Sequence, residues 1–176
     1  MADGTAADYR LIDTHEEQLS AGLADQVLGW LRMMDGPSPY RISRFDHSRQ
    51  SATRAEADGA DDETVFCALL HDIGDVLSPV NHSEVGAAVL RPYVSDRNYR
   101  IVKHHGLFQG YYWMHHYDRD RNERDRYAGH QWYDATVAFC HEWDQNCFDP
   151  NHPTKPLEYF EPLVREILGR TPVGYL

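Results

Sequence analysis

The chain has 176 residues and a formal net charge of −11 at pH 7 with histidine neutral. This length suits one domain and is enough to bury a sizeable core around a polar site. The acidic balance argues against nucleic acid or anionic membranes as partners, because both call for clustered Lys and Arg. No stretch approaches the roughly 18 apolar residues of a spanning helix, and MADGTAADYR lacks the apolar core of a secretion signal. We therefore expect a cytoplasmic protein; its composition leaves the oligomeric state open.

The first predicted elements are two amphipathic segments separated by a loop. Residues 15 to 34 carry leucine and valine at spacings of three to four, which predicts a helix ended by Gly36 and Pro37. The loop GPSPYRISRF then leads to a helix that opens near His47. Gly59 ends that helix, because glycine is the usual residue in the left-handed conformation that follows a helix.

The next predicted elements lie before and after the turn HDIGD. Asp61 or Asp62 caps a helix whose nearly continuous apolar run, VFCALL, predicts a central and buried position. After the turn, a helix runs through His82, and Ser95 or Asp96 caps another one beyond it. Each of these helices brings at least one histidine with it.

The last third begins with a charge-dense connector over residues 117–129 and then resumes helical spacing. Apolar residues from Trp132 onward predict a helix whose last turns hold Asp144, and a final short helix spans residues 157–168. No alternating strand pattern of useful length and no internal repeat is found. The predicted fold class is all-α.

The most informative residues are the adjacent His71 and Asp72, which directly follow the apolar run. A buried and unpaired imidazole or carboxylate carries a desolvation cost of several kcal/mol, which a bound metal ion relieves. The pair therefore predicts a metal site at the end of the central helix.

Four further candidate ligands are spaced along the other predicted helices. They are His47, 24 residues before His71; His82, 10 after Asp72; His105, 23 after His82; and Asp144, 39 after His105. Four imidazoles and two carboxylates are more than one ion usually takes from protein, whereas two ions bridged by an aspartate use about that number. This ligand chemistry suits iron, manganese or zinc. The three cysteines have no CxxC spacing, so a zinc-thiolate site is not indicated.

The ordered set H…HD…H…H…D resembles the HD-domain superfamily of helical metalloproteins, over about residues 40–168. Within it, the chain looks closer to the mixed-valent diiron oxygenases, which include myo-inositol oxygenase and the enzymes that cleave 1-hydroxyphosphonates. This resemblance implies a single HD domain over residues 1–176, with residues 1–36 as an N-terminal helix region. It also implies a helical bundle around a buried dinuclear site with two iron ions.

Local segments favour the oxygenase branch. Helical geometry alone separates His104 and His105 by about 100° without choosing between them as ligands, but VKHHGLFQGYY resembles a helix of that branch in which the second histidine is the ligand. EWDQ resembles the segment of its last ligand. The resemblance implies that Asp72 bridges the irons and is catalytic, that His47, His71 and Asp144 hold one iron, and that His82 and His105 hold the other.

The resemblance also implies a substrate and a reaction. The substrate is a 1-hydroxyphosphonate, such as 1-hydroxy-2-(trimethylammonio)ethylphosphonate, which reacts with O2. The products are phosphate and a carboxylic acid, which is glycine betaine for that substrate.

Two positions depart from the related enzymes that act on the simple amino substrate. Their turn reads HDIGH, whereas this chain has Asp75, an anion that would repel a phosphonate and attract a quaternary ammonium. Gln109 stands where those enzymes have a lysine, so the cationic partner of the phosphonate is expected to be Lys103, Arg41 or Arg44.

Two further residues are expected near the substrate. Tyr40 is a candidate for a loop tyrosine that occupies the iron before substrate arrives, and His104 is a candidate for contact with substrate or with a carboxylate behind the ligands.

Two other functions compete with the oxygenase. A metal-dependent HD phosphohydrolase would use the same site to activate water against nucleotides or other phosphate esters. A non-catalytic HD domain would bind metal for a regulatory purpose only.

Overall fold

The computed structural model describes residues 2–173, and the described part of the chain forms α-helices and short 3₁₀ or π turns without any β-strand. The predicted all-α fold class is confirmed. The α-helices are α1 (Ala6–Ala21), α2 (Leu23–Met33), α3 (Arg44–Ala57), α4 (Asp62–Leu70), α5 (His82–Leu90), α6 (Asp96–Trp113), α7 (Tyr133–Phe139) and α8 (Leu157–Leu168). No helix among the described residues is both long and apolar enough to cross a membrane.

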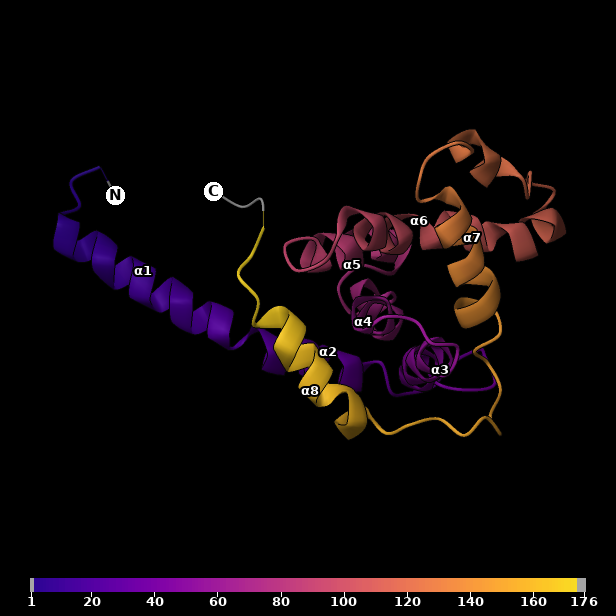
Figure 1. Ribbon diagram of the computed structural model, residues 1–176, viewed down its shortest axis with the longest axis horizontal. Coiled ribbons are helices and arrows are strands. Elements are labelled where there is room, and N and C mark those ends of the chain that lie inside the picture. Colours follow the sequence, from indigo (N-terminus) through magenta and orange to yellow (C-terminus); the bar gives the residue numbers. More distant parts are fainter. Residues whose placement is uncertain (1, 174–176) are drawn as a thin grey trace.

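Helix α4 lies at the centre of the helical body, as its apolar run predicts. Figure 1 shows it between α3 on one side and α5 and α6 on the other, and α8 also packs against it. All its residues from Thr64 to Leu70 are buried. The side chain of Asp61 caps its first turn by accepting a hydrogen bond from the Thr64 amide at 2.7 Å. His71 and Asp72, which directly follow α4, therefore lie in the interior.

Gly59 ends α3 as predicted and turns the chain into α4. Its φ of +80° is in the left-handed region that favours glycine. The Gly59 amide donates to Glu56 O and the Ala60 amide donates to Ala55 O, both at 3.0 Å, which is the Schellman pattern. The tight reversal places α3 alongside α4.

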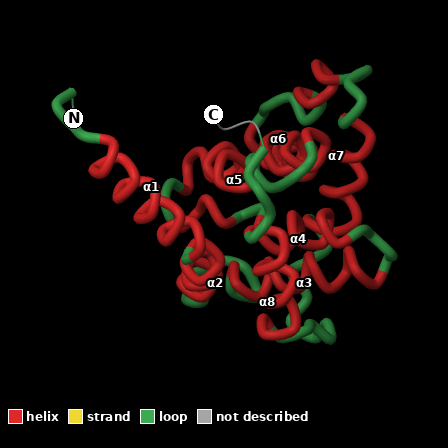
Figure 2. Tube along the Cα trace, turned by 60° about the vertical axis from the view of Figure 1, so that its left-hand side comes forward, coloured by secondary structure: helices red, strands yellow, loops and turns green. Residues whose placement is uncertain are grey.

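The predicted helix over residues 15–34 is wrong in both its start and its continuity. The structure has two helices, α1 and α2, and the chain changes direction between them at Gly22. Only α2 packs into the body, through Val27, Leu28 and Leu31. Helix α1 has no buried residue and projects from the body as an arm, as both views show (Figures 1 and 2). Apolar spacing in this region therefore predicted helix correctly but not burial.

The helix predicted to end near Asp144 also differs from the structure. Helix α7 ends at Phe139 and a π-helical turn, Cys140–Asp144, follows it. The Gln145 amide donates to Cys140 O, five residues back, at 3.0 Å. Such wide turns are frequent at functional sites. This one ends with a buried Asp144 facing the interior of the bundle.

Candidate metal centre

The six predicted ligands come from separate elements and meet in one place. His47 lies in the first turn of α3; His71 and Asp72 follow α4; His82 opens α5; His105 lies in the middle of α6; Asp144 closes the π turn. Five of them are buried, and the His82 side chain is 23% exposed. Residues 97 positions apart in the sequence, His47 and Asp144, thus approach within hydrogen-bonding range.

One set of groups surrounds the buried side of the centre. His47 Nε2 lies 3.1 Å from His71 Nε2 and 3.4 Å from Asp144 Oδ1. His71 Nε2 lies 3.8 Å from the same Asp144 oxygen. One oxygen of Asp72, Oδ2, completes the set at 3.7 Å from each of the two imidazole nitrogens. Two imidazoles and two carboxylate oxygens thus converge on one point.

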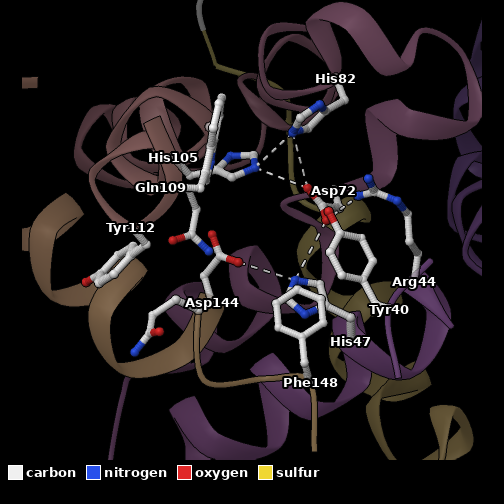
Figure 3. Close-up of a pocket in the computed structure, with 13 residues that line it drawn as sticks. Tyr40, Arg44, His47, Asp72, His82, His105, Gln109, Tyr112, Asp144 and Phe148 are labelled. Carbon is white, nitrogen blue, oxygen red and sulfur yellow. Dashed lines mark hydrogen bonds and ion pairs between the residues drawn. The ribbon is translucent and has the colours of Figure 1, made fainter. Parts of the chain in front are cut away.

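A second set lies toward the more open side. His105 Nε2 is 3.1 Å from the other oxygen of Asp72, Oδ1, and His82 Nε2 is 3.4 Å from it. The two imidazole nitrogens are 3.3 Å apart. Figure 3 shows Asp72 between this pair and His47. The two oxygens of one carboxylate therefore face two different groups of imidazoles, which is the arrangement that a bridging ligand requires.

All four histidines are oriented by the backbone. In each ring Nδ1 lies against a carbonyl oxygen: Cys147 O for His47 at 2.9 Å, Ala68 O for His71 at 2.8 Å, Pro79 O for His82 at 3.1 Å and Val102 O for His105 at 2.6 Å. A carbonyl only accepts, so Nδ1 carries the proton and a neutral ring presents a bare lone pair at Nε2. Anchoring of this kind is usual for metal-binding histidines.

The close approach of these lone pairs fits bound cations. Two unprotonated Nε2 atoms 3.1 Å apart, as in His47 and His71, cannot hydrogen bond to one another, whereas a metal ion accepts both. His47, His71 and Asp144 are also grouped tightly enough to bind one ion, and so are His71, Asp72 and His105. The residues present therefore fit a metal centre.

Burial and charge favour the protonation states that metal binding needs in His71 and Asp72, whereas in His47 and His105 the effect of burial is outweighed by the neighbouring Asp144 and Asp72, which raise the pKa of both imidazoles. Burial lowers the pKa of His71 to about 4, because the imidazolium form is poorly solvated there. Burial by itself would raise the pKa of Asp72, but the surrounding His71, His105 and His47 lower it well below the usual range. A neutral imidazole and an ionised carboxylate are both ready to bind a cation at neutral pH.

Helix α6 approaches α5 closely because residue 106 is glycine. A Cβ at Gly106 would lie 2.6 Å from Ser83 Oγ and 3.7 Å from His82 Nε2. The missing side chain lets His82 come within reach of His105. Gly106 also lines the cavity beside the centre.

A cavity of about 390 Å³ opens onto the candidate metal centre (Figure 3). Its lining residues are Tyr40, Arg44, His47, Asp72, His82, His105, Gly106, Gln109, Tyr112, Trp113, Asp144, Gln145 and Phe148. Four of these are large aromatic side chains, and Phe148 stacks on the His47 ring with centroids 4.4 Å apart. A small molecule could reach the ligand side chains through this cavity.

Three of the residues expected to bind substrate, Tyr40, Arg44 and Gln109, line this cavity. Gln109 Oε1 is buried and has no hydrogen-bond partner within the described residues. A buried polar atom without a partner is unusual, and one that borders a cavity indicates a place for a ligand or water. Tyr40 packs its ring against Phe148, with centroids 4.8 Å apart.

His104 and Lys103, which are expected to contact substrate or, for His104, a carboxylate behind the ligands, are not among the residues that line the cavity. His104 stacks face to face on Trp132, with centroids 4.5 Å apart and an angle of 5°. Burial lowers its pKa to about 4, with a further contribution from Lys103. Lys103 extends toward Glu84, with 3.8 Å between Nζ and Oε1. Adjacent residues of a helix point about 100° apart. His104 therefore packs against Trp132, while His105 points toward Asp72.

Asp75 also lies outside the cavity, so the expectation that it faces a quaternary ammonium is not supported by its position. Its carboxylate forms an ion pair with Arg44 and lies 3.5 Å from His82 Nδ1. Burial raises the pKa of Asp75, and the negative charge of Asp72 raises it further. Its carboxylate therefore interacts with the protein behind the metal centre.

Sequence reasoning missed three aromatic residues of the cavity, and two of them carried a usable signal. Tyr112 and Trp113 follow His105 by seven and eight positions, and Gln109 follows it by four. Those spacings place all of them on one face of α6. Phe148 lies in an irregular segment, where no periodicity could have identified it.

Comparison with known families agrees with this geometry. The family model described as HD domain matches residues 44–130. The matched segment contains His47, His71, Asp72, His82 and His105, while Asp144 lies beyond its end. No curated protein matches the chain in sequence.

Proposed function

From the HD domain formed by residues 44–130, we propose that the protein is a diiron oxygenase that cleaves the C–P bond of a 1-hydroxyphosphonate. HD domains belong to a superfamily of metal-dependent hydrolases and oxygenases. The observation on which the proposal rests is the position of Asp72, whose two oxygens face two separate groups of imidazoles. That geometry supports two ions bridged by one carboxylate.

The proposed reaction consumes one O2 per substrate. The C–P bond breaks, C1 is oxidised from a secondary alcohol to a carboxylic acid, and phosphorus leaves as inorganic phosphate. Two iron ions would supply the activation of O2 and a binding site for substrate oxygens. His47, His71 and Asp144 would hold one ion, and His82 and His105 the other.

The cavity supports a small zwitterionic substrate. Arg44 and Gln109 offer hydrogen-bond donors for phosphonate oxygens. The aromatic side chains of Tyr40, Tyr112 and Trp113 offer faces that attract a quaternary ammonium through cation–π interactions. A trimethylammonio substrate would use both features, with glycine betaine as the product. In this proposal the aromatic rings, and not Asp75, attract the trimethylammonio group of the substrate.

Metal content and oxygen consumption test the proposal together. Protein purified without oxygen is expected to contain about two irons per chain. Addition of 1-hydroxy-2-(trimethylammonio)ethylphosphonate should consume O2 and release phosphate in a 1:1 ratio. The matched control is the same substrate without its 1-hydroxyl group, which should give neither change.

The phosphohydrolase alternative predicts a different outcome. It requires release of phosphate from nucleotides or other phosphate esters in the absence of O2. If that release occurs, and no 1-hydroxyphosphonate consumes O2, the oxygenase proposal is wrong. If the metal-loaded protein shows neither activity, the HD domain has a binding role instead.

A further inference from the structure

Arg44 is the first residue of α3 and lies beside the candidate metal centre. Among the described residues that line the cavity, it is the one with a permanent positive charge. Its side chain is 38% exposed, and it lines both this cavity and a second cavity that Asp75 borders. Arg41 and Lys103, the other cationic residues considered from the sequence, do not line the cavity.

Two carboxylates hold the guanidinium by a single nitrogen. Nη1 donates to Asp72 Oδ2 at 3.1 Å and also forms the ion pair with Asp75. Neither Nη2 nor Nε has a protein hydrogen-bond partner within the described part of the chain. Arginine presents five N–H donors in a planar fork, so the remaining donors are available to a ligand.

Asp75 is placed to hold Arg44 rather than to meet a ligand. Its side chain is 7% exposed, and its two oxygens face Arg44 and His82. Arg44 also passes over the ring of Tyr40, with 5.8 Å from Cζ to the centroid. Asp72, Asp75 and Tyr40 together restrict the guanidinium to the edge of the centre.

We propose that Arg44 binds the anionic group of the substrate through its free donors, and that Asp75 is the positioning residue that holds the guanidinium at the metal centre. The ligand class is a tetrahedral oxyanion, either phosphonate or phosphate. This inference rests on the proposed function only in that the substrate carries such a group. A phosphate ester would satisfy it equally.

Titration calorimetry of the iron-loaded protein under anaerobic conditions tests the role of Arg44, with methylphosphonate and inorganic phosphate as probes. Arg44→Gln should raise the Kd of both by about 10- to 100-fold, because charge-assisted hydrogen bonds are lost. Arg44→Lys should give an intermediate Kd, since lysine restores the charge without the fork. The matched control is Arg97→Gln, the same change at an exposed arginine outside the cavity, with an unchanged Kd.

Asp75→Asn tests the positioning role, because it removes the charge at nearly constant volume. The Kd of methylphosphonate should rise by about fivefold, and Arg44→Gln/Asp75→Asn should bind no more weakly than Arg44→Gln alone. A purely structural role would give additive losses. If Asp75 acted only by repelling anions, the Asn variant would bind methylphosphonate more tightly. If it contacted a quaternary ammonium, only the trimethylammonio substrate would bind more weakly.

Each variant needs its iron content and thermal unfolding measured first. If Arg44→Gln loses iron, Arg44→Lys alone decides the role of Arg44. Wild-type Kd values in the arginine variants that retain two irons would overturn the inference. That outcome is separate from the proposed function: oxygen uptake with a wild-type KM in Arg44→Gln would leave the oxygenase standing. Weaker phosphate binding in the Arg44 variants, together with no oxygen uptake by the wild type, would support the role of Arg44 and refute the oxygenase.

Discussion

Removal of His82 should convert the proposed two-ion centre into a one-ion centre. The ring contacts the centre only through Nε2, which lies 3.3 Å from His105 Nε2 and 3.4 Å from Asp72 Oδ1. His47, His71 and Asp144 keep their arrangement when His82 becomes alanine, because none of them contacts this ring. We therefore expect His82→Ala to keep the buried ion and to lose the exposed one.

The size of the effect follows from the ligand number. The second set supplies His82, His105 and one oxygen of Asp72, so the variant loses one of three protein ligands. Even substitutions behind the ligands lower metal affinity by about 10- to 100-fold, so loss of a ligand should weaken this ion by about 100-fold or more, or at least about 2.7 kcal/mol. The His82 side chain is 23% exposed, so the fold should tolerate its truncation.

Elemental analysis of protein purified anaerobically gives the metal content per chain, and circular dichroism checks the fold. We expect about two irons in the wild type and about one in His82→Ala. His104→Phe is the matched control: it changes the neighbour of a ligand, keeps an aromatic ring on Trp132 and should retain two irons. Two irons in His82→Ala, or none in a folded variant, would refute the assignment of two ligand sets joined by Asp72.

Three further changes test other parts of the structure. Asp72→Asn should leave the folded protein with less than one iron per chain by elemental analysis, because both ligand sets share this carboxylate; retention of two irons would contradict a bridging role. Gly59→Ala should destabilise the protein by about 1 kcal/mol in urea unfolding, since φ is +80° there, while iron content stays unchanged; an unchanged midpoint would argue against the left-handed turn. Burial and Lys103 lower the pKa of His104 from 6.5 to about 4. Between these two pH values the unfolded state binds more protons than the folded state, so the free energy of unfolding should fall as the pH decreases from 6.5 toward 4. His104→Phe should show a smaller loss than the wild type between pH 7 and pH 5 in urea unfolding of metal-free protein, and an equal loss would assign the effect to other groups.

Much of the helical framework was predictable because its signals are local. The predicted caps are present at the first member of each pair of candidates, Asp61 and Ser95, and each accepts a hydrogen bond from an amide three residues later. The final helix, Leu157–Leu168, has the predicted bounds. A capping residue and the apolar spacing that follows it lie within one or two turns of chain. Such patterns act before any tertiary packing.

Long-range geometry explains most of what differed. Leu19 continues an apolar pattern but is 67% exposed, because α1 leaves the body after Gly22. Asp75 was expected to face substrate, but it turns toward Arg44, which comes from a helix about 30 residues earlier in the chain. The direction of each side chain depends on which neighbours are packed around it. Periodicity within one segment does not specify those neighbours.

The sequence by itself determined the residue types of the candidate centre and the helices that present them. The order of four histidines and two aspartates was legible because each lies at a helix end or on a helix face. Only the tertiary structure decided how these groups are divided. The split of Asp72 between two imidazole pairs depends on the packing of α3, α5 and α6 around the end of α4. Distances between side chains on different helices are set by that packing, which no local pattern encodes.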